Sequence, residues 1–143
     1  MEKETIDLNV SGFAAMANVS FKYFIGKGSG HLVAISSIAA LRGSRIAPAY
    51  NASKAFVSSY MQGLQQKAAK MGSHVCVTDI KPGFVDTAMA KGKGLFWVEP
   101  PRKVAKQIFE LIKNRKTHGY VTRRWRLIAW LLRIMPRRIY NRL

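Results

Sequence analysis

The chain has 143 residues, 48% of them hydrophobic, and this length and composition exclude a disordered protein and predict one globular domain with a single core. The formal net charge of +17 is extreme for this length, and residues 101–143 hold thirteen Lys and Arg against one acid, Glu110. Such a charge favours an anionic partner, either phospholipid headgroups or nucleic acid, and says little about the fold.

Hydrophobic patterning predicts helices and strands in alternation. Helical spacing of apolar residues indicates helices at about 6–25, 49–71 and 104–112, and a tail helix from about 124. In the first helix the apolar positions are Leu8, Phe13, Met16, Val19 and Phe24. Short apolar runs bounded by turn residues indicate strands at 31–37, 74–80 and 119–122. This order is typical of a parallel α/β sheet with right-handed crossovers.

Two loops of this sheet are the expected ligand site. Ligands bind outside the carboxyl ends of the strands of an open parallel sheet, which points to the loops that begin at Ser37 and Pro82. The segment 91–101, rich in Gly, Lys and Pro, is expected to be a mobile loop. We expect no boundary between two folded domains: residues 1–122 form the α/β unit and residues 123–143 a basic amphipathic tail helix.

The beginning of the chain and its cysteine bear on its compartment. Residues 1–4 are acidic and basic, with no apolar run behind them long enough for a signal peptide. No segment reaches the roughly 18 apolar residues that a membrane-spanning helix needs. The single cysteine, Cys76, lies in an apolar run and is expected to be a small core residue. These features predict a cytoplasmic protein.

Tyr50 and Lys54 stand four residues apart in the helix predicted at 49–71, so their side chains share one face. A tyrosine is a weak acid at neutral pH, and a cation held close favours its phenolate and suits it to acid-base catalysis. Ser37, at the end of the preceding strand, can donate a hydrogen bond to a carbonyl oxygen on which negative charge develops. Together the three residues suit proton transfer to a carbonyl, although a Tyr-Lys pair at this spacing is by itself commonplace.

A longer set of motifs resembles the short-chain dehydrogenase/reductase family. Two serines end a strand at 36–37, Tyr-Asn-Ala-Ser-Lys at 50–54 matches the family's Tyr-x-x-x-Lys motif, and Pro-Gly at 82–83 follows the next strand. Asn9 is similar to the family's helix asparagine, and Thr87 stands where the family's Pro-Gly-x-x-x-Thr motif places its threonine. The resemblance covers about residues 6–120 and implies a partial Rossmann-like parallel sheet of about three strands.

The resemblance also implies roles for single residues. Tyr50 is the general acid/base, Lys54 assists it and binds the nicotinamide ribose, Ser37 steadies the substrate oxygen, and Asn9 supports a proton relay. The cofactor is NADP or NAD, and its nicotinamide half is expected to contact Tyr50, Lys54, Pro82, Gly83, Val85 and Thr87. A complete form of the enzyme is implied to be a homodimer through the helices at 6–25 and 49–71.

The departures from the family are as informative as the matches. Members are roughly twice this length, and their first half holds a glycine-rich turn, the residue that selects NAD or NADP, and an Asn-Asn-Ala-Gly segment, all absent here. The glycines at 26–30 and at 92–94 do not replace that turn, because neither group links a strand to a helix. The sheet would also have an open edge beside the strand at 31–37. We expect the chain alone to be inactive or nearly so, whether it is a fragment, is completed by another chain, or is a non-catalytic remnant.

The tail combines arginine and tryptophan with an apolar face. Helical positions place Arg126, Arg133 and Arg137 on one narrow stripe, while most of the remaining surface is apolar. This is the composition of a helix that lies in an anionic membrane interface, so a peripheral membrane location is expected. Packing on the domain or on a subunit partner is the alternative. Nucleic acid is disfavoured because no groove-reading or stacking motif accompanies the cations.

The remaining aromatic residues and histidines give weaker indications of function. Phe84, Phe96 and Trp97 fall near the expected pocket and suit an apolar substrate, although ordinary packing explains them equally well. The three histidines are isolated, so no metal site is expected. The sequence therefore predicts an NAD(P)-dependent oxidoreductase of alcohol or ketone groups, acting on an apolar or lipid-like substrate. The alternative is a non-catalytic, truncated relative that serves as an interaction or membrane-binding module.

Overall fold

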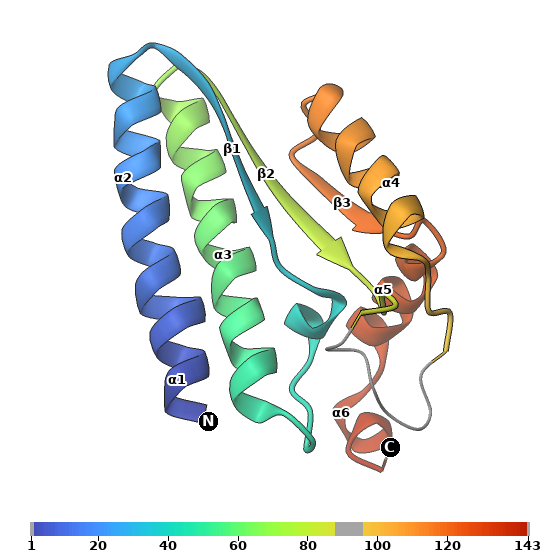
Figure 1. Ribbon diagram of the computed structural model, residues 1–143. Coiled ribbons are helices and arrows are strands. Elements are labelled where there is room, and N and C mark those ends of the chain that lie inside the picture. The colour runs from blue at the N-terminus through green and yellow to red at the C-terminus, as the bar shows by residue number, and fades with distance from the viewer. Residues whose placement is uncertain (1, 88–95, 143) are drawn as a thin grey trace.

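The structure is a computed structural model that describes residues 2–87 and 96–142 (Figure 1). Its strands are β1 (Ser29–Ile35), β2 (His74–Pro82) and β3 (His118–Val121), which form a parallel sheet in the order β1-β2-β3. Its helical elements are α1 (Glu2–Ile6), the π-helix η1 (Asp7–Gly12), α2 (Phe13–Gly26), the 3-10 helix η2 (Ile38–Leu41), α3 (Pro48–Lys70), α4 (Pro101–Lys113), α5 (Trp125–Ile134) and α6 (Arg137–Tyr140). The predicted fold class is confirmed.

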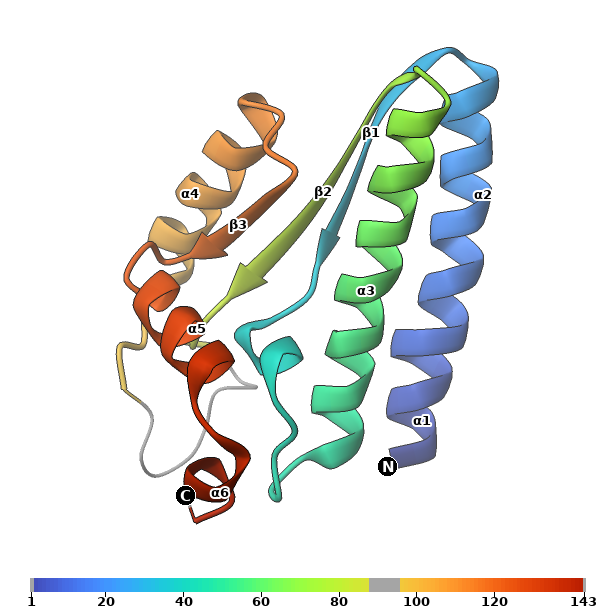
Figure 2. The same ribbon diagram turned by 180° about the vertical axis from the view of Figure 1, so that it is seen from behind.

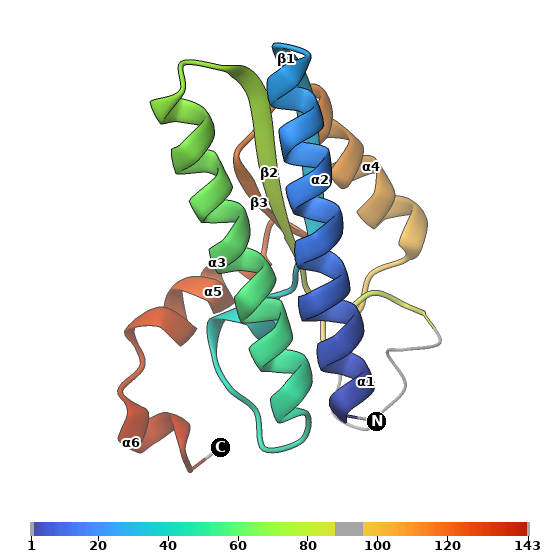
Figure 3. The same cartoon turned by 90° about the vertical axis from the view of Figure 1, so that its left-hand side faces the viewer.

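The sheet is covered by helices on both faces. Figure 3 shows α2 and α3 side by side over one face, with α4 on the other. The core under α2 and α3 is built from Phe21, Met61, Val75 and Val77, among other apolar side chains. The core under α4 contains Ile80, Val104 and Val121. Strand β2 is buried over most of its length, as expected for a strand of a parallel sheet that is covered on both faces.

The first helix is longer and more exposed than its sequence pattern indicates. Elements α1, η1 and α2 form one helical run, with a π-helical segment where Asn9 lies. The helix is confirmed, but three of the apolar residues that marked it, Leu8, Met16 and Val19, are exposed. The buried positions are Ala17 and Phe21. The pattern therefore located the helix but not its inner face.

Several boundaries have direct local causes. Proline occupies the first turn of α3 and of α4, where its missing N–H costs no helical hydrogen bond. The chain leaves α3 through Gly72, whose φ of +60° is the left-handed conformation that glycine adopts most readily. Pro136 follows the last turn of α5, and α6 begins directly after it. Part of the loop expected at 91–101, including Gly92 and Gly94, lies outside the described residues.

One edge of the sheet is open within the described part of the chain. There β1 pairs with β2 through the register Ser29↔His74 to Ile35↔Ile80, and with no other strand (Figure 2). The open edge expected from the sequence is therefore present. An unpaired row of backbone N–H and C=O groups is a template for a further strand.

His31, on strand β1, is expected to make the free energy of unfolding depend on pH. Thr78 Oγ1 donates to the carbonyl of Lys116 at 2.6 Å, so the 2.7 Å contact with His31 Nε2 requires the histidine to donate. Burial, and next the positive charge of Arg115, hold the pKa of His31 below its ordinary value of 6.5. The unfolded chain therefore takes up this proton more readily than the folded one, and stability is lost as the pH falls below 6.5 toward the folded pKa.

We expect His31→Gln to remove part of the acid destabilisation. The measurement is urea unfolding of both proteins between about pH 8 and pH 5. A His31→Gln variant with the same pH slope as the parent would assign the loss of stability to other groups.

Candidate active site

The candidate site lies at the carboxyl ends of the strands, and Ser37 is placed there. The strand before it ends at Ile35, two residues earlier than expected, so Ser37 is the N-cap of η2 and not part of β1. Its Oγ accepts a hydrogen bond from the backbone N–H of Ala39 at 3.1 Å. A hydroxyl that accepts through a lone pair keeps its own hydrogen for donation. Ser37 is thus held in place and can still donate.

Tyr50 and Lys54 lie in the first two turns of α3, beside the end of β1. Lys54 Nζ is 5.7 Å from the centre of the Tyr50 ring and donates to the carbonyl of Ile35 at 3.2 Å. Burial lowers the pKa of Lys54, and the negative charge of Asp79 opposes that shift. The predicted pair is therefore brought together with a half-buried amine at the same end of the sheet as Ser37.

Asn9 reaches this helix from the N-terminal run. Its Nδ2 donates to Ser53 Oγ at 3.1 Å, and Ser53 Oγ in turn donates to the carbonyl of Tyr50 at 2.8 Å. Ser53 is buried. The π-helical segment widens the helix locally at Asn9, and such segments occur frequently at functional sites. Asn9 is therefore linked through Ser53 to the backbone of Tyr50.

Asn51 braces the loop that holds Ser37, a role that sequence reasoning did not assign. It is buried, and its Nδ2 donates to the carbonyls of Ala39 at 3.1 Å and Arg42 at 2.7 Å. These bonds join the loop after β1 to the start of α3. The signal in the sequence was an amide side chain directly after Tyr50, inside a predicted helix. Because Asn51 fixes the two segments together, it sets the separation of Ser37 from Tyr50.

A buried charged cluster behind the site was also missed. Asp79 on β2 accepts hydrogen bonds from Ser36 Oγ and Ser58 Oγ and forms an ion pair with Lys81. Asp79 and Lys81 are two residues apart on a strand, so they face the same side of the sheet. The sequence could have indicated this cluster, because two opposite charges stand two residues apart at the end of a predicted strand. The carboxylate of Asp79 holds the strand end that precedes Ser37.

The residues expected at the nicotinamide follow β2. Pro82 ends the strand, and the backbone N–H of Gly83 donates to the carbonyl of Val121 at 2.6 Å. Val85 forms an isolated parallel bridge with Glu99. Thr87 is exposed, and its Oγ1 donates to the carbonyl of Val85 at 3.4 Å. These residues follow the carboxyl end of β2, as Ser37 follows that of β1, but no contact joins Thr87 to Tyr50 or Lys54 in the described part of the chain.

Trp125, at the start of α5, has a structural role that the sequence did not reveal. Its side chain is 2% exposed and packs edge-on to Phe84 at a centroid distance of 5.3 Å. Phe96 and Trp97 also stack against it, at 5.2 and 6.2 Å. A Cβ at Gly83 would overlap the indole. Gly83 is thus required by this packing, and the three aromatic residues expected near a pocket pack on one another and on Trp125.

None of the helices in ranges 2–87 and 96–142 is long and apolar enough to cross a membrane. The same ranges contain no group of three or more His, Cys, Asp or Glu side chains that could hold a metal ion.

Comparison with known proteins gives the fold and the family. Residues 2–95 match the model of the short chain dehydrogenase family. An uncharacterized oxidoreductase of Staphylococcus aureus (strain USA300) is 39% identical over 84 residues, which are 59% of this chain and 36% of that protein. One of Myxococcus xanthus is 42% identical over 84 residues, 59% of this chain and 32% of that protein. The matched region thus covers about a third of the length of these relatives.

Solved structures share the fold over most of the chain. A short chain dehydrogenase from Burkholderia cenocepacia, in complex with NADP, superposes with a TM-score of 0.83 at 20% identity, covering 100% of this chain and 60% of that one. A short-chain dehydrogenase/reductase from Burkholderia phymatum, in complex with NAD, gives 0.71 at 20% identity, covering 86% and 54%. At this identity the likeness shows the fold. Since the family model matches well over half of the residues, the chain belongs to the short-chain dehydrogenase family.

Proposed function

We propose that this chain carries the proton-transfer half of an NAD(P)-dependent oxidoreductase that interconverts alcohols and ketones. The family is one of oxidoreductases, and the observation that carries the proposal is the half-buried Lys54 amine beside the ring of Tyr50. Ser37 lies next to the carbonyl group of Ile35 to which that amine donates, two residues further along the chain. Three groups suited to one proton transfer therefore surround a single strand end.

Each residue has a distinct part in this reaction. The hydroxyl of Tyr50 donates its proton to the substrate oxygen during reduction and takes it back during oxidation. The ammonium of Lys54 stabilises the phenolate that remains. Ser37 donates to the same substrate oxygen as its negative charge grows. Asn9 acts through Ser53 on the position of Tyr50, so it is a positioning residue.

The donor set fits the nicotinamide half of the cofactor. An ammonium has three N–H donors, and Lys54 uses one on Ile35, which leaves two for ribose hydroxyls. Tyr50, Lys54, Pro82, Gly83, Val85 and Thr87 would hold this half. When bound, NADH or NADPH would supply the hydride for ketone reduction, and NAD or NADP would take it up in alcohol oxidation; solved structures of the same fold with these molecules support that class. The glycines at 26–30 lie at the amino end of β1, opposite the site, so they do not fit the phosphates (Figure 1).

The aromatic cluster suggests the substrate class. Phe96 and Trp97 are partly exposed and pack against Trp125, which also contacts Phe84 in the segment after β2. An apolar, lipid-like alcohol or ketone suits such a wall. Turnover of a series of 2-alkanones of increasing length by a longer protein that carries this sequence checks this point, and the ratio kcat/KM should rise with the length of the alkanone. Equal turnover of small polar ketones would contradict it.

Exchange of Tyr50 tests the reaction itself. In a longer protein that carries this sequence and turns over ketones, we expect Tyr50→Phe to slow ketone reduction by about a hundredfold or more, because the proton donor is lost while the ring remains. Lys54→Ala should lower the rate and also weaken cofactor binding, measured by the fluorescence of NADH and NADPH. The matched control is Tyr60→Phe, a tyrosine of the same helix that packs on Phe13 and Phe56. A Tyr50→Phe variant as fast as the Tyr60→Phe variant would refute the proposal.

A second function, that of a non-catalytic interaction module, is favoured by two observations. The matched relatives extend well beyond the matched region, and the described part of β1 has a free edge. We expect the 143-residue chain alone to show little or no turnover. Saturable NADH or NADPH binding that Lys54→Ala weakens would support the enzyme. Absence of binding at millimolar cofactor, and absence of turnover in any longer protein that carries this sequence, would support the module.

A further inference from the structure

The tail helix α5 has apolar side chains on two opposite faces. Its inner face packs on η2 and Phe84 through Trp125, Ile128, Ala129 and Leu132, which follow helical spacing. Its outer face presents Leu127, Trp130 and Ile134, which are 68%, 62% and 55% exposed, together with Leu131. We call these four residues the outer stripe. A soluble helix that is already packed on one face normally carries polar residues on the other, so the stripe requires an explanation.

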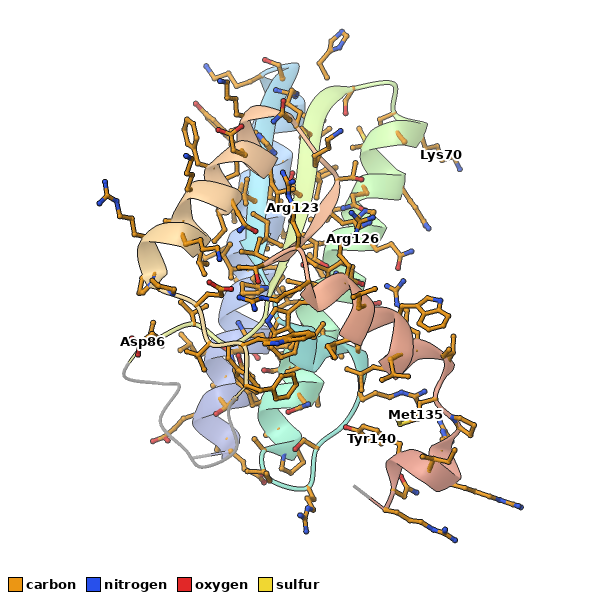
Figure 4. All side chains as sticks on the ribbon, turned by 90° about the vertical axis from the view of Figure 1, so that its right-hand side faces the viewer. Lys70, Asp86, Arg123, Arg126, Met135 and Tyr140 are labelled. Carbon is orange, nitrogen blue, oxygen red and sulfur yellow. The ribbon has the colours of Figure 1, made fainter. Side chains whose placement is uncertain are left out.

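The stripe faces outward because the helix is fastened to the body. Arg42, in the loop between β1 and α3, donates from Nε to the carbonyl of Leu132 at 2.6 Å and from a terminal guanidinium nitrogen to that of Met135 at 2.7 Å. The guanidinium also lies 5.6 Å from the ring of Tyr140, whose hydroxyl donates to the carbonyl of Gly43. Figure 4 shows Met135 and Tyr140 beside this loop. Rotation of α5 that would bury the stripe would break these bonds.

Charge on the same segment has one sign. Residues 123–142 contain seven arginines and no acidic residue. Arg126 and Arg133 are exposed and lie along one side of the stripe. Arg137 and Arg138 are the first two residues of the short helix α6. Arg124 is the exception, since it pairs with the buried Glu99. An apolar stripe with a tryptophan and a border of exposed arginines is complementary to the acyl boundary and headgroups of an anionic bilayer.

We propose that α5 and α6 form a docking surface for anionic phospholipid membranes, with the outer stripe inserted at the interface and the arginines on the headgroups. An isolated duplex of nucleic acid would match the arginines and leave the stripe exposed to water. A protein partner would match the stripe, but the six arginines other than Arg124 would need an equally acidic partner. The bilayer satisfies both features at once. Since α5 lies at the carboxyl ends of the strands, the membrane would sit beside the proposed active site (Figure 1).

The test is co-sedimentation with vesicles of phosphatidylcholine alone or with about 30% phosphatidylglycerol. The parent should bind the anionic vesicles and leave the neutral ones largely in solution. Trp130→Ser with Ile134→Ser should weaken binding by about tenfold or more, and so should Arg126→Gln with Arg133→Gln. The assay needs neither cofactor nor substrate, so its failure would leave the proposed reaction untouched.

Matched control variants on α4 distinguish binding through the proposed docking surface from non-specific binding of exposed apolar or cationic side chains. Phe109→Ser removes an apolar side chain that is 61% exposed on α4, and Arg102→Gln with Lys106→Gln removes two exposed cations of that helix. Both controls should bind as the parent does, and circular dichroism should show all variants folded. Equal binding by the stripe variants and the parent would overturn the proposal. So would a dimer in solution that Trp130→Ser dissociates without any vesicle binding, because a second copy would then cover the stripe.

Discussion

Trp125→Ala is expected to lower the free energy of unfolding by about 3–5 kcal/mol, as is usual for a fully buried tryptophan. The indole is 2% exposed and fills the space between Gly83, Phe84 and the start of α5. Its loss removes apolar contacts and leaves a cavity, because Gly83 has no side chain to move into it. The strand end that carries Gly83 would lose its cover at the same time.

Trp130→Ala is the matched control on the same helix. That tryptophan is exposed, so its replacement should change stability by no more than about 0.5 kcal/mol. The comparison is made by urea unfolding of the parent and both variants, followed by circular dichroism. Similar midpoints for the two variants would show that Trp125 does not hold α5 on the body, and the docking surface would then lose its rigid support.

Asp79→Ala is expected to be comparably severe, at about 3–5 kcal/mol, because it leaves the amine of Lys81 buried without its partner. Asp79 is 3% exposed and also accepts from Ser36 and Ser58. Its charge raises the pKa of Lys54 against the effect of burial, so its removal should lower that pKa further. Stability is measured by urea unfolding, and the Lys54 amine is followed by NMR titration.

A double exchange distinguishes loss of the pair from loss of packing. Asp79→Leu with Lys81→Met replaces both charges by apolar groups of similar size, and most of the lost stability should return. Ser36 keeps a second acceptor, the carbonyl of Ile80, in this variant. Asp86→Ala, which removes an exposed acid, should have little effect. If the double variant were as unstable as Asp79→Ala, the cost would lie in packing and not in an unpaired charge.

The secondary structure followed closely from local patterns, with errors where burial depends on neighbours. The strand at His74 and the helix of Val104, Ile108 and Leu111 were located from apolar runs and spacing, and both are present. The apolar spacing that marked this helix did not reveal the inner face of α2, because Met16 and Val19 are apolar yet exposed. Periodicity shows that a helix has an apolar side, but a helix with apolar residues all round does not reveal which side meets the sheet.

The candidate site divides in the same way. Tyr50 and Lys54 were recognised because residues four apart share one face of any helix, where the amine can act on the phenol. Their location at the same end of the sheet as Ser37 followed from the parallel order of the strands. Asn51, Asp79 and Trp125 were missed, because each acts on a partner that is distant in sequence. Cys76, expected in the core, is only half-buried, since its face of the sheet is incompletely covered in the described residues.

The sequence alone determined the order of elements, the position of the Tyr-Lys pair, the open sheet edge and the cationic tail, because these depend on spacing, propensity and charge along a continuous segment. The tertiary structure decided how the tail packs on the rest of the chain. One apolar face of α5 is turned inward and the other is left exposed by two sets of contacts. These are the hydrogen bonds of Arg42 and Tyr140 and the packing of Trp125 against Gly83. No local pattern contains that choice, because both faces are apolar and only contacts with distant residues distinguish them.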